Sequence, residues 1–123
     1  MDAFGLPKGN DEEKAARTAA IQEATRYAIE IPFRVMKRSF AAMEILNAMA
    51  ETGNPNSVSD AGVGALAVRS AVMGAYLNVK INASGLDDKA FVDSVLKEGA
   101  VIEQKTIKLE KQILETVNKK ISG

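Results

Sequence analysis

The segment from residue 54 to residue 60 concentrates polar side chains immediately before a stretch of small apolar residues. It contains Asn54, Asn56, Ser57, Ser59 and Asp60. A helix that begins here presents unpaired backbone N–H groups, which suit an anion, and the carboxamides offer paired donors and acceptors, which suit a heteroaromatic ring. The same residue types are common helix caps and turn formers. The segment is therefore either the edge of a binding site or a helix cap alone.

Two asparagines near the far end of the same apolar stretch form a second polar group. Asn78 and Asn82 are four residues apart, so a helix places them on one face. Asparagine is a poor interior helix residue and a buried carboxamide needs partners, so the pair indicates a polar network or a ligand. Arg69 lies between the two groups. It is either the partner of an acidic group across a bundle, which we favour, or a contact for an anionic ligand tail.

The composition restricts the chemistry of any such site. The 123 residues include no cysteine and no histidine, which excludes disulfides, a thiol nucleophile, a metal site of Cys and His, and imidazole catalysis. Proton transfer must then use Asp, Glu, Lys or Tyr. Sixteen basic residues balance sixteen acidic ones and are interleaved with them, so no nucleic-acid partner is predicted. The N-terminal residues do not form a signal peptide, and the expected location is cytoplasmic.

The elements that must position these side chains are predicted to be helices. Asn10 followed by Glu13 has the form of a capping box, which predicts a helix that begins near Asp11. Its apolar residues follow steps of three and four, and the predicted buried stripe consists of Ile21, Ala24, Ala28, Ile31 and Val35. This spacing is typical of a half-buried helix.

Pro32 is predicted to interrupt that first helix. Proline removes a backbone donor and clashes with the preceding turn, so we expect a kink or break and a second helical stretch over residues 33–51. Gly53 is the predicted C-cap of that stretch. Ser57 is the predicted N-cap of the next helix, where Asp60 faces the positive end of the helix dipole.

The helix over residues 61–79 carries small and apolar side chains on nearly every face. Such a helix is typically buried on all sides, with neighbours packed against its small residues: Gly62, Gly64, Ala67, Ala71, Gly74 and Ala75. A membrane span is disfavoured, because Gly and Ala dominate and Arg69 at mid-span would cost roughly 2.5 to 3.5 kcal/mol. We therefore expect no membrane partner.

The last helix is predicted over residues 88–121. Gly85 closes the preceding helix and Asp87 is the predicted N-cap. Two seven-residue series mark its apolar positions, Val95, Ile102 and Leu109, and Ile107, Leu114 and Ile121. No segment alternates long enough to form a strand. Four or five helices with short connections predict an all-α, antiparallel bundle that forms one unit over residues 1–123. Its apolar central helix requires further cover, from a missing N-terminal helical segment or a second subunit.

Two long stretches of the chain resemble a known enzyme family. They are "LPKGNDEEKAARTAAIQEA" and "GNPNSVSDAGVGALAVRSAVMGAYLNVKIN". Their motifs occur in the same order as in the C-terminal part of the cyclodeaminase and cyclohydrolase family. This family comprises the cyclodeaminase domain of formiminotransferase-cyclodeaminase and the bacterial methenyltetrahydrofolate cyclohydrolases. The resemblance covers nearly the whole chain.

This resemblance implies a reaction of folate one-carbon metabolism in a helical homodimer. The activity that we expect is that of a cyclodeaminase, which closes 5-formiminotetrahydrofolate to 5,10-methenyltetrahydrofolate and releases ammonia. The alternative is that of a cyclohydrolase, which adds water to the methenyl bridge. Both move protons with no metal and no tightly bound cofactor, and a tetrahydrofolate derivative is the substrate. The candidate substrate-binding residues are Asn54, Asn56, Ser59, Asp60, Asn78 and Asn82.

The catalytic residue is not assigned within this sequence. The family's catalytic aspartate lies upstream of the stretch that matches "MDAFGLPK", so Asp2 does not occupy its position. We therefore expect a truncated product, a late-start gene model or a fragment. A second reading, from another class of protein, is a helical module that assembles without catalysis and uses its small-residue helix as a subunit seam. A membrane helix pair with close-packed glycines is a third.

Overall fold

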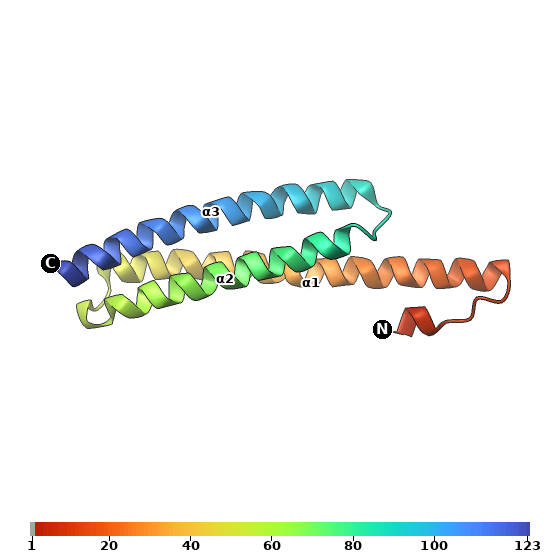
Figure 1. The fold of residues 1–123 in the computed structure, drawn as a ribbon, viewed down its shortest axis with the longest axis horizontal. Coiled ribbons are helices and arrows are strands. Elements are labelled where there is room, and N and C mark those ends of the chain that lie inside the picture. The colour runs from red at the N-terminus through yellow and green to blue at the C-terminus, as the bar shows by residue number, and fades with distance from the viewer. Residues whose placement is uncertain (1) are drawn as a thin grey trace.

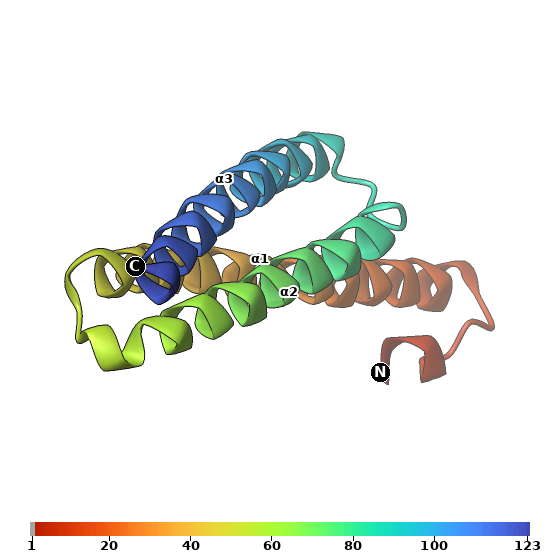
Figure 2. The ribbon, with the colours of Figure 1, turned by 60° about the vertical axis from the view of Figure 1, so that its left-hand side comes forward.

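The computed structural model describes residues 2–123, which form three long α-helices and two short 3-10 turns. The helices are α1 (Asp11–Thr52), α2 (Val58–Ala83) and α3 (Lys89–Ser122), and the turns are η1 (Asp2–Gly5) and η2 (Pro55–Ser57). Successive helices run antiparallel, and α2 and α3 pack against the C-terminal part of α1 (Figures 1 and 2). The N-terminal part of α1 projects beyond them, with η1 folded back beside it. The predicted all-α bundle is confirmed, with three helices instead of four or five.

The difference in helix number arises at Pro32, where the predicted break is wrong. α1 continues through Pro32 for 42 residues. The flanking Ile29, Phe33 and Met36 are buried between α2 and α3, and this tertiary packing outweighs the local cost of about 3 kcal/mol of a proline inside a helix. Because proline has no amide hydrogen, the carbonyl oxygen of Ala28 is left without its helical donor.

The first helix begins with the predicted capping box. The N–H of Glu13 donates to Asn10 Oδ1 at 2.8 Å, and the N–H of Gly9 donates to Glu13 Oε2 at 2.9 Å. Gly53 is the C-cap, as predicted, and its N–H donates to the Met49 carbonyl oxygen. Local sequence signals thus set both ends of α1.

The caps of α2 and α3 differ in detail from the prediction. Ser57 occupies the N-cap position of α2, but its hydroxyl makes no capping hydrogen bond. Asp88, and not Asp87, caps α3, because its carboxylate accepts from the N–H of Phe91 at 3.1 Å. The prediction for α3 was therefore wrong by one residue.

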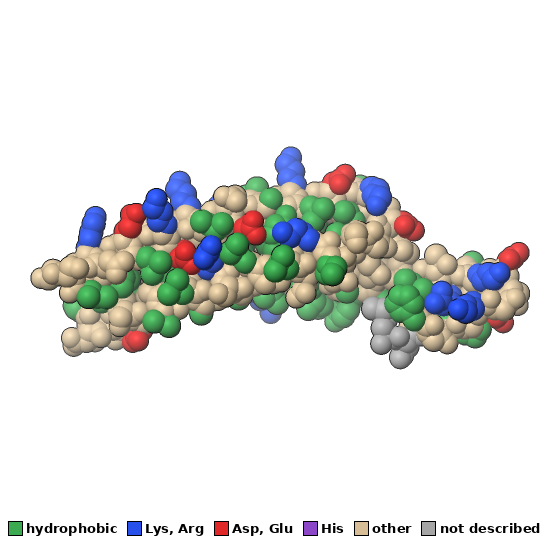
Figure 3. Space-filling view, in the orientation of Figure 1, with side chains coloured by type: hydrophobic (Ala, Val, Ile, Leu, Met, Phe, Trp, Pro, Cys, Tyr) green, Lys and Arg blue, Asp and Glu red, His purple; other side chains and the backbone are tan. Residues whose placement is uncertain are grey.

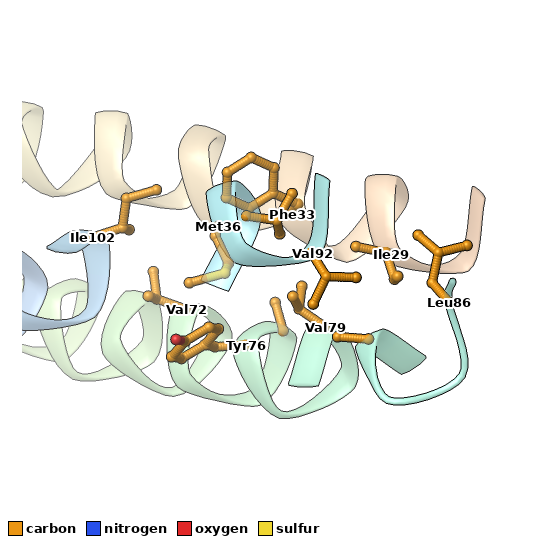
Figure 4. Packing of buried hydrophobic residues seen from close by; sticks show 12 residues of the cluster. Ile29, Phe33, Met36, Val72, Tyr76, Val79, Leu86, Val92 and Ile102 are labelled. Carbon is orange, nitrogen blue, oxygen red and sulfur yellow. The ribbon is translucent and has the colours of Figure 1, made fainter. Parts of the chain in front are cut away.

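The buried stripe of α1 is not the predicted one. Buried residues of α1 are Ile29, Phe33, Met36, Met43 and Ala50. The first three pack with Val72, Tyr76 and Val79 of α2 and with Val92 and Ile102 of α3 (Figure 4). Met43 and Ala50 belong to a second cluster, which contains Val58, Ala61 and Ala65 of α2 and Ile113 and Val117 of α3. In contrast, Ile31 and Val35 are 37% and 43% exposed. α1 carries two apolar faces, and α2 and α3 together cover only one fully.

The outer face of α2 is also uncovered, in contrast to the predicted burial on all sides. Val63, Leu66, Leu77 and Ile81 are exposed. Gly62 and Gly64 do pack closely, against Val117 and Leu46, but a Cβ at Gly74 would meet nothing within 4 Å. Figure 3 shows hydrophobic side chains open on this face, whereas charged side chains project along α3. Two neighbouring helices cannot surround a third, so cover from outside these residues stays a prediction.

The segment Pro55–Ala83 is long and apolar enough to cross a membrane by length and composition. Within the apolar 18-residue window of this segment, 33% of the residues are buried. Core helices of soluble proteins pass the same test, because they too are apolar on most faces.

Polar contacts from α1 and α3 fasten the ends of the bundle. Gln22 of α1 donates to the Gly85 carbonyl oxygen at 3.0 Å and accepts from the N–H of Asp87 at 2.8 Å. At the other end, Lys120 of α3 donates to the carbonyl oxygens of Ala50 and Glu51, which end α1. The Gln22 contacts join α1 to the connection between α2 and α3, and the Lys120 contacts join the end of α3 to the end of α1.

Replacing Tyr76 with phenylalanine tests a hydrogen bond between α2 and α3. The buried hydroxyl donates to the Leu96 carbonyl oxygen at 2.8 Å, and we expect its loss to lower the free energy of unfolding by about 1 kcal/mol at neutral pH. Burial, and secondarily the charge of Glu103, raises the pKa of Tyr76. In the unfolded chain this tyrosine ionises near pH 10, and in the folded protein it ionises only at higher pH. The stabilisation of the wild type by the neutral hydroxyl is therefore complete below about pH 10 and is lost as the pH rises through the folded pKa.

The measurement is urea unfolding of wild type and Tyr76→Phe at a series of pH values. The difference between the two proteins should be constant up to about pH 10 and then shrink. A difference that stays constant into strongly alkaline solution would contradict this role for the phenol.

Candidate functional site

A groove of about 590 Å³ opens between α1 and α2. Nine residues line it: Tyr27, Ala28, Ile31, Pro32, Val35, Ala71, Ala75, Asn78 and Asn82. Because the two helices are antiparallel, Tyr27 and Asn82 lie toward one end and Val35 and Ala71 toward the other. The walls are mostly apolar, and the polar side chains gather at the first end. Apolar walls with a few convergent polar groups are typical of small-molecule sites.

The two predicted asparagines lie together in this groove. Asn82 Nδ2 donates to the backbone carbonyl oxygen of Asn78 at 2.9 Å, which fixes the Asn82 side chain and leaves its oxygen available. Asn78 is exposed and Asn82 is half-buried, so the premise of buried carboxamides was wrong. Within residues 3–123 they form no wider polar network, so the polar network that the sequence suggested is not found there.

Pro32 adds a backbone acceptor to the groove. Pro32 and Ala28 both line the groove, and the Ala28 carbonyl oxygen has lost its helical donor to the proline. A buried or half-buried carbonyl normally has a partner. A ligand N–H can supply it. The groove is therefore lined by two carboxamide residues of α2 and by Ala28 of α1, whose carbonyl oxygen lacks its usual helical donor.

The polar segment at 54–60 lies at the opposite end of α2. Asn54 Oδ1 accepts from the N–H of Asn56 at 3.0 Å, and Ser59 and Asp60 are exposed. Asp60 and Asn78 are 18 positions apart, which is about 27 Å along a helix at about 1.5 Å per residue. A single chain therefore does not bring the two polar groups together, and Asn78 and Asn82 do not hold the 54–60 loop in place.

Arg69 forms the ion pair that we favoured. Its Nε lies 3.5 Å from Glu110 Oε2 of α3, and the Glu110 side chain is only 12% exposed. Arg69 thus faces α3, away from the groove, so it neutralises a largely buried carboxylate and is not available to a ligand there.

The side chains of the groove suit ligand binding better than proton transfer. Of the nine residues on its walls, only Tyr27 has an ionisable side chain. No three carboxylates, cysteines or histidines within residues 2–123 lie together in a way that could hold a metal ion. Apart from the Tyr27 hydroxyl, the groove walls therefore carry no side chain that could act as an acid or a base on a ligand.

Comparison with known proteins identifies the family. The family model for formiminotransferase-cyclodeaminase matches residues 1–100, most of the chain. The chain belongs to this family. The resemblance noted in the sequence is therefore confirmed.

Individual members of the formiminotransferase-cyclodeaminase family match at moderate identity. Methenyltetrahydrofolate cyclohydrolase of Methylorubrum extorquens is 43% identical over 99% of this chain and 59% of its own length. Formimidoyltransferase-cyclodeaminase of Rattus norvegicus is 36% identical over 74% of this chain and 17% of its own length. The protein of the same name from Dictyostelium discoideum is 35% identical over 96% of this chain and 21% of its own length. The chain thus spans just over half of the first relative and 17% and 21% of the other two.

Sequence reasoning missed the α1 wall of the groove in this family member. Ile31 and Val35 were predicted to lie in the buried stripe and Tyr27 was not singled out, because periodicity alone cannot show which of two apolar faces a neighbour covers. One signal was present. A proline in the middle of a long amphipathic pattern marks a carbonyl oxygen without its helical donor.

Proposed function

We propose that the groove between α1 and α2 binds the pterin ring of a tetrahydrofolate derivative, and that the complete protein hydrolyses the methenyl bridge of 5,10-methenyltetrahydrofolate. The groove geometry supports the binding step. A pterin is a flat ring with an amino group and ring N–H donors beside a carbonyl acceptor. The Asn78 carboxamide and the Ala28 carbonyl oxygen offer the complementary groups, and Ile31, Ala75 and Tyr27 offer apolar surface.

The choice of hydrolysis is supported by sequence identity. The cyclohydrolase of M. extorquens is 43% identical to this chain, whereas the formimidoyltransferase-cyclodeaminases of R. norvegicus and D. discoideum are 36% and 35% identical, although the latter also matches 96% of this chain. In the proposed reaction, a water oxygen bonds to the methenyl carbon, the bond from that carbon to N5 breaks, and a proton is released. The alternative is the cyclodeaminase reaction, in which N10 attacks the formimino carbon and ammonia leaves.

The proton-transfer group of this reaction is proposed to come from outside the groove. Asp60 is exposed at the far end of α2, and Asp60 and Asn78 lie nine positions on either side of Arg69. If the uncovered α2 faces of two subunits packed antiparallel with their centres together, Asp60 of one subunit would approach Asn78 of the other. We therefore propose a homodimer in which Asn54, Asn56, Ser59 and Asp60 complete the site of the neighbouring subunit.

Substitution of the groove asparagines tests the binding proposal. Asn78→Ala and Asn82→Ala are each expected to weaken binding of 5-formyltetrahydrofolate about two- to tenfold, because each removes hydrogen bonds worth roughly 0.5 to 1.5 kcal/mol. Titration calorimetry on the complete protein gives the dissociation constants. Asn118→Ala is the matched control, because Asn118 is an exposed asparagine of α3 outside the groove.

Two results would overturn the proposal in different ways. If the wild-type protein bound no folate, the groove would not be a folate site. If it bound folate and 5,10-methenyltetrahydrofolate persisted while 5-formiminotetrahydrofolate was converted, the cyclodeaminase alternative would replace hydrolysis. The absorbance of 5,10-methenyltetrahydrofolate distinguishes these two reactions.

A further inference from the structure

Most aromatic rings of this chain have a cationic side chain over one face. The chain has four phenylalanines and two tyrosines, and four of these rings are paired in this way: Phe4 with Arg17 at 5.6 Å from the ring centroid, Phe33 with Lys37 at 4.4 Å, Tyr76 with Lys80 at 4.6 Å and Phe91 with Arg26 at 4.0 Å. Of the remaining two, Phe40 packs against the core. Tyr27 is 61% exposed, and no cation from residues 3–123 lies over its ring.

The charges beside Tyr27 favour a cationic ligand over an anionic one. Arg26, the neighbouring cation, lies 3.1 Å from both Glu30 and Asp88, which binds it to the start of α3. Glu23 lies one turn before Tyr27 on the same face of α1 and forms no ion pair within residues 3–123. Glu23, Arg26, Tyr27 and Glu30 border one hollow of about 500 Å³ on α1. Three carboxylates thus accompany a single guanidinium on this side of the ring.

The substrate of the proposed reaction is itself a cation. When water adds to the methenyl carbon and the bond from that carbon to N5 breaks, a proton is released and a neutral formyl group remains. The bridge of 5,10-methenyltetrahydrofolate therefore carries one positive charge that the product lacks, and N5, N10 and the carbon between them share it in a flat group. The negative face of an aromatic ring attracts such a cation when the cation lies within about 6 Å of the ring centroid.

We propose that the face of the Tyr27 ring binds the positively charged methenyl bridge by a cation–π contact, and that this contact selects the cationic substrate over its neutral formyl product. This inference rests on the proposed function. Tyr27 lies at the same end of the groove as Asn82, and the bridge is fused to the pterin ring that the groove is proposed to bind there. Tyr27 carries the one aromatic ring on the groove walls, and no carboxylate lines them. Within the groove the cation therefore meets this ring in place of an ion pair.

The test compares a cationic and a neutral ligand in one assay of the complete protein. The substrate is 5,10-methenyltetrahydrofolate, and the competitive inhibitor is 5-formyltetrahydrofolate, whose formyl group is uncharged. Tyr27→Leu removes the ring and keeps an apolar side chain. It is expected to raise KM for the substrate about three- to thirtyfold, to raise the inhibition constant less than about threefold, and to change kcat little. Tyr27→Phe keeps the ring, and its KM should stay within about twofold of the wild type.

Ile31→Ala is the matched control, because Ile31 lies one turn further along the same groove wall and has no ring. It removes apolar surface only, so it should raise KM and the inhibition constant by the same factor. If Tyr27→Leu also raised both equally, Tyr27 would be an apolar wall alone, and the inference would be wrong while the proposed function stood. If Tyr27→Phe raised KM as much as Tyr27→Leu, the hydroxyl and not the ring would hold the substrate, which would also overturn the inference. If the wild type neither hydrolysed the substrate nor bound 5-formyltetrahydrofolate, the proposed function would fall, and the cation contact with it.

Discussion

Replacement of Pro32 with alanine is expected to raise the free energy of unfolding by about 1 to 3 kcal/mol. α1 is continuous through Pro32, so alanine fits the existing backbone and supplies the missing N–H to the Ala28 carbonyl oxygen. The gain is reduced by roughly 0.4 to 1 kcal/mol, because proline restricts the unfolded chain and alanine does not. Urea unfolding should show a higher midpoint with an unchanged slope.

The same substitution is expected to weaken folate binding. Ala28 lines the groove, and in the wild type its carbonyl oxygen lacks its helical donor, whereas in Pro32→Ala the new N–H binds this oxygen and competes with the ligand for it. A protein that becomes more stable and binds less tightly would show that the proline is retained for the site at a cost in stability.

Pro55→Ala provides the matched control for Pro32. Pro55 begins η2, a position where a helical turn requires no N–H, so its replacement should change stability by less than about 1 kcal/mol and should not raise it. If Pro32→Ala lowered the stability, the carbonyl at Ala28 would have another partner in the native protein. If it raised the stability but left the dissociation constant of 5-formyltetrahydrofolate unchanged, the carbonyl would not contact the ligand.

The parts of this fold that local chemistry decides could be predicted from sequence. The start of α1 is set by Asn10 and Glu13 and its end by Gly53, and the structure confirms both. The ion pair of Arg69 was foreseen because an arginine on an apolar helix requires a counter-charge. These inferences need no knowledge of which helix lies beside which.

Features that depend on neighbouring helices could not be predicted in the same way. Pro32 breaks an isolated helix, but here packing of Ile29 and Met36 supports both sides of it. Ile31 and Ile29 are equally apolar, and only the position of α2 and α3 decides that Ile29 is buried and Ile31 lines a groove. The asparagine pair could be predicted from its spacing, whereas its α1 partners could not.

The outer face of α2 is apolar, as predicted, but the described residues do not bury it. The residues over 61–79 are small and apolar on every side, which predicts burial. Within the described residues, only α1 and α3 cover them, and Gly74 meets open space. The sequence of α2 therefore predicts contacts beyond those within the described residues, and a glycine on that face offers a direct way to detect them.

Gly99→Ala is expected to lower the free energy of unfolding by about 1 to 2 kcal/mol. A Cβ at Gly99 would lie 2.5 Å from Cε1 and 2.9 Å from Cδ1 of Tyr76. The ring cannot move away freely, because its hydroxyl is bound to the Leu96 carbonyl oxygen. The helix-propensity gain of about 1 kcal/mol on replacing glycine with alanine offsets only part of this overpacking. In a Tyr76→Ala background the clash is absent, and the same substitution should become stabilising.

Gly74→Ala is the matched control, and the sign of its effect is informative. Gly74 is also inside a helix, but no atom lies within 4 Å of the added Cβ, so alanine should raise stability by about 0.5 to 1 kcal/mol. Thermal or urea unfolding of the two variants, measured together, should therefore give changes of opposite sign. If Gly99→Ala proved stabilising, the contact between α2 and α3 would be looser than described. If Gly74→Ala proved destabilising in the complete protein, a neighbour would have to pack against the outer face of α2, because nothing in the described part of the chain reaches that position.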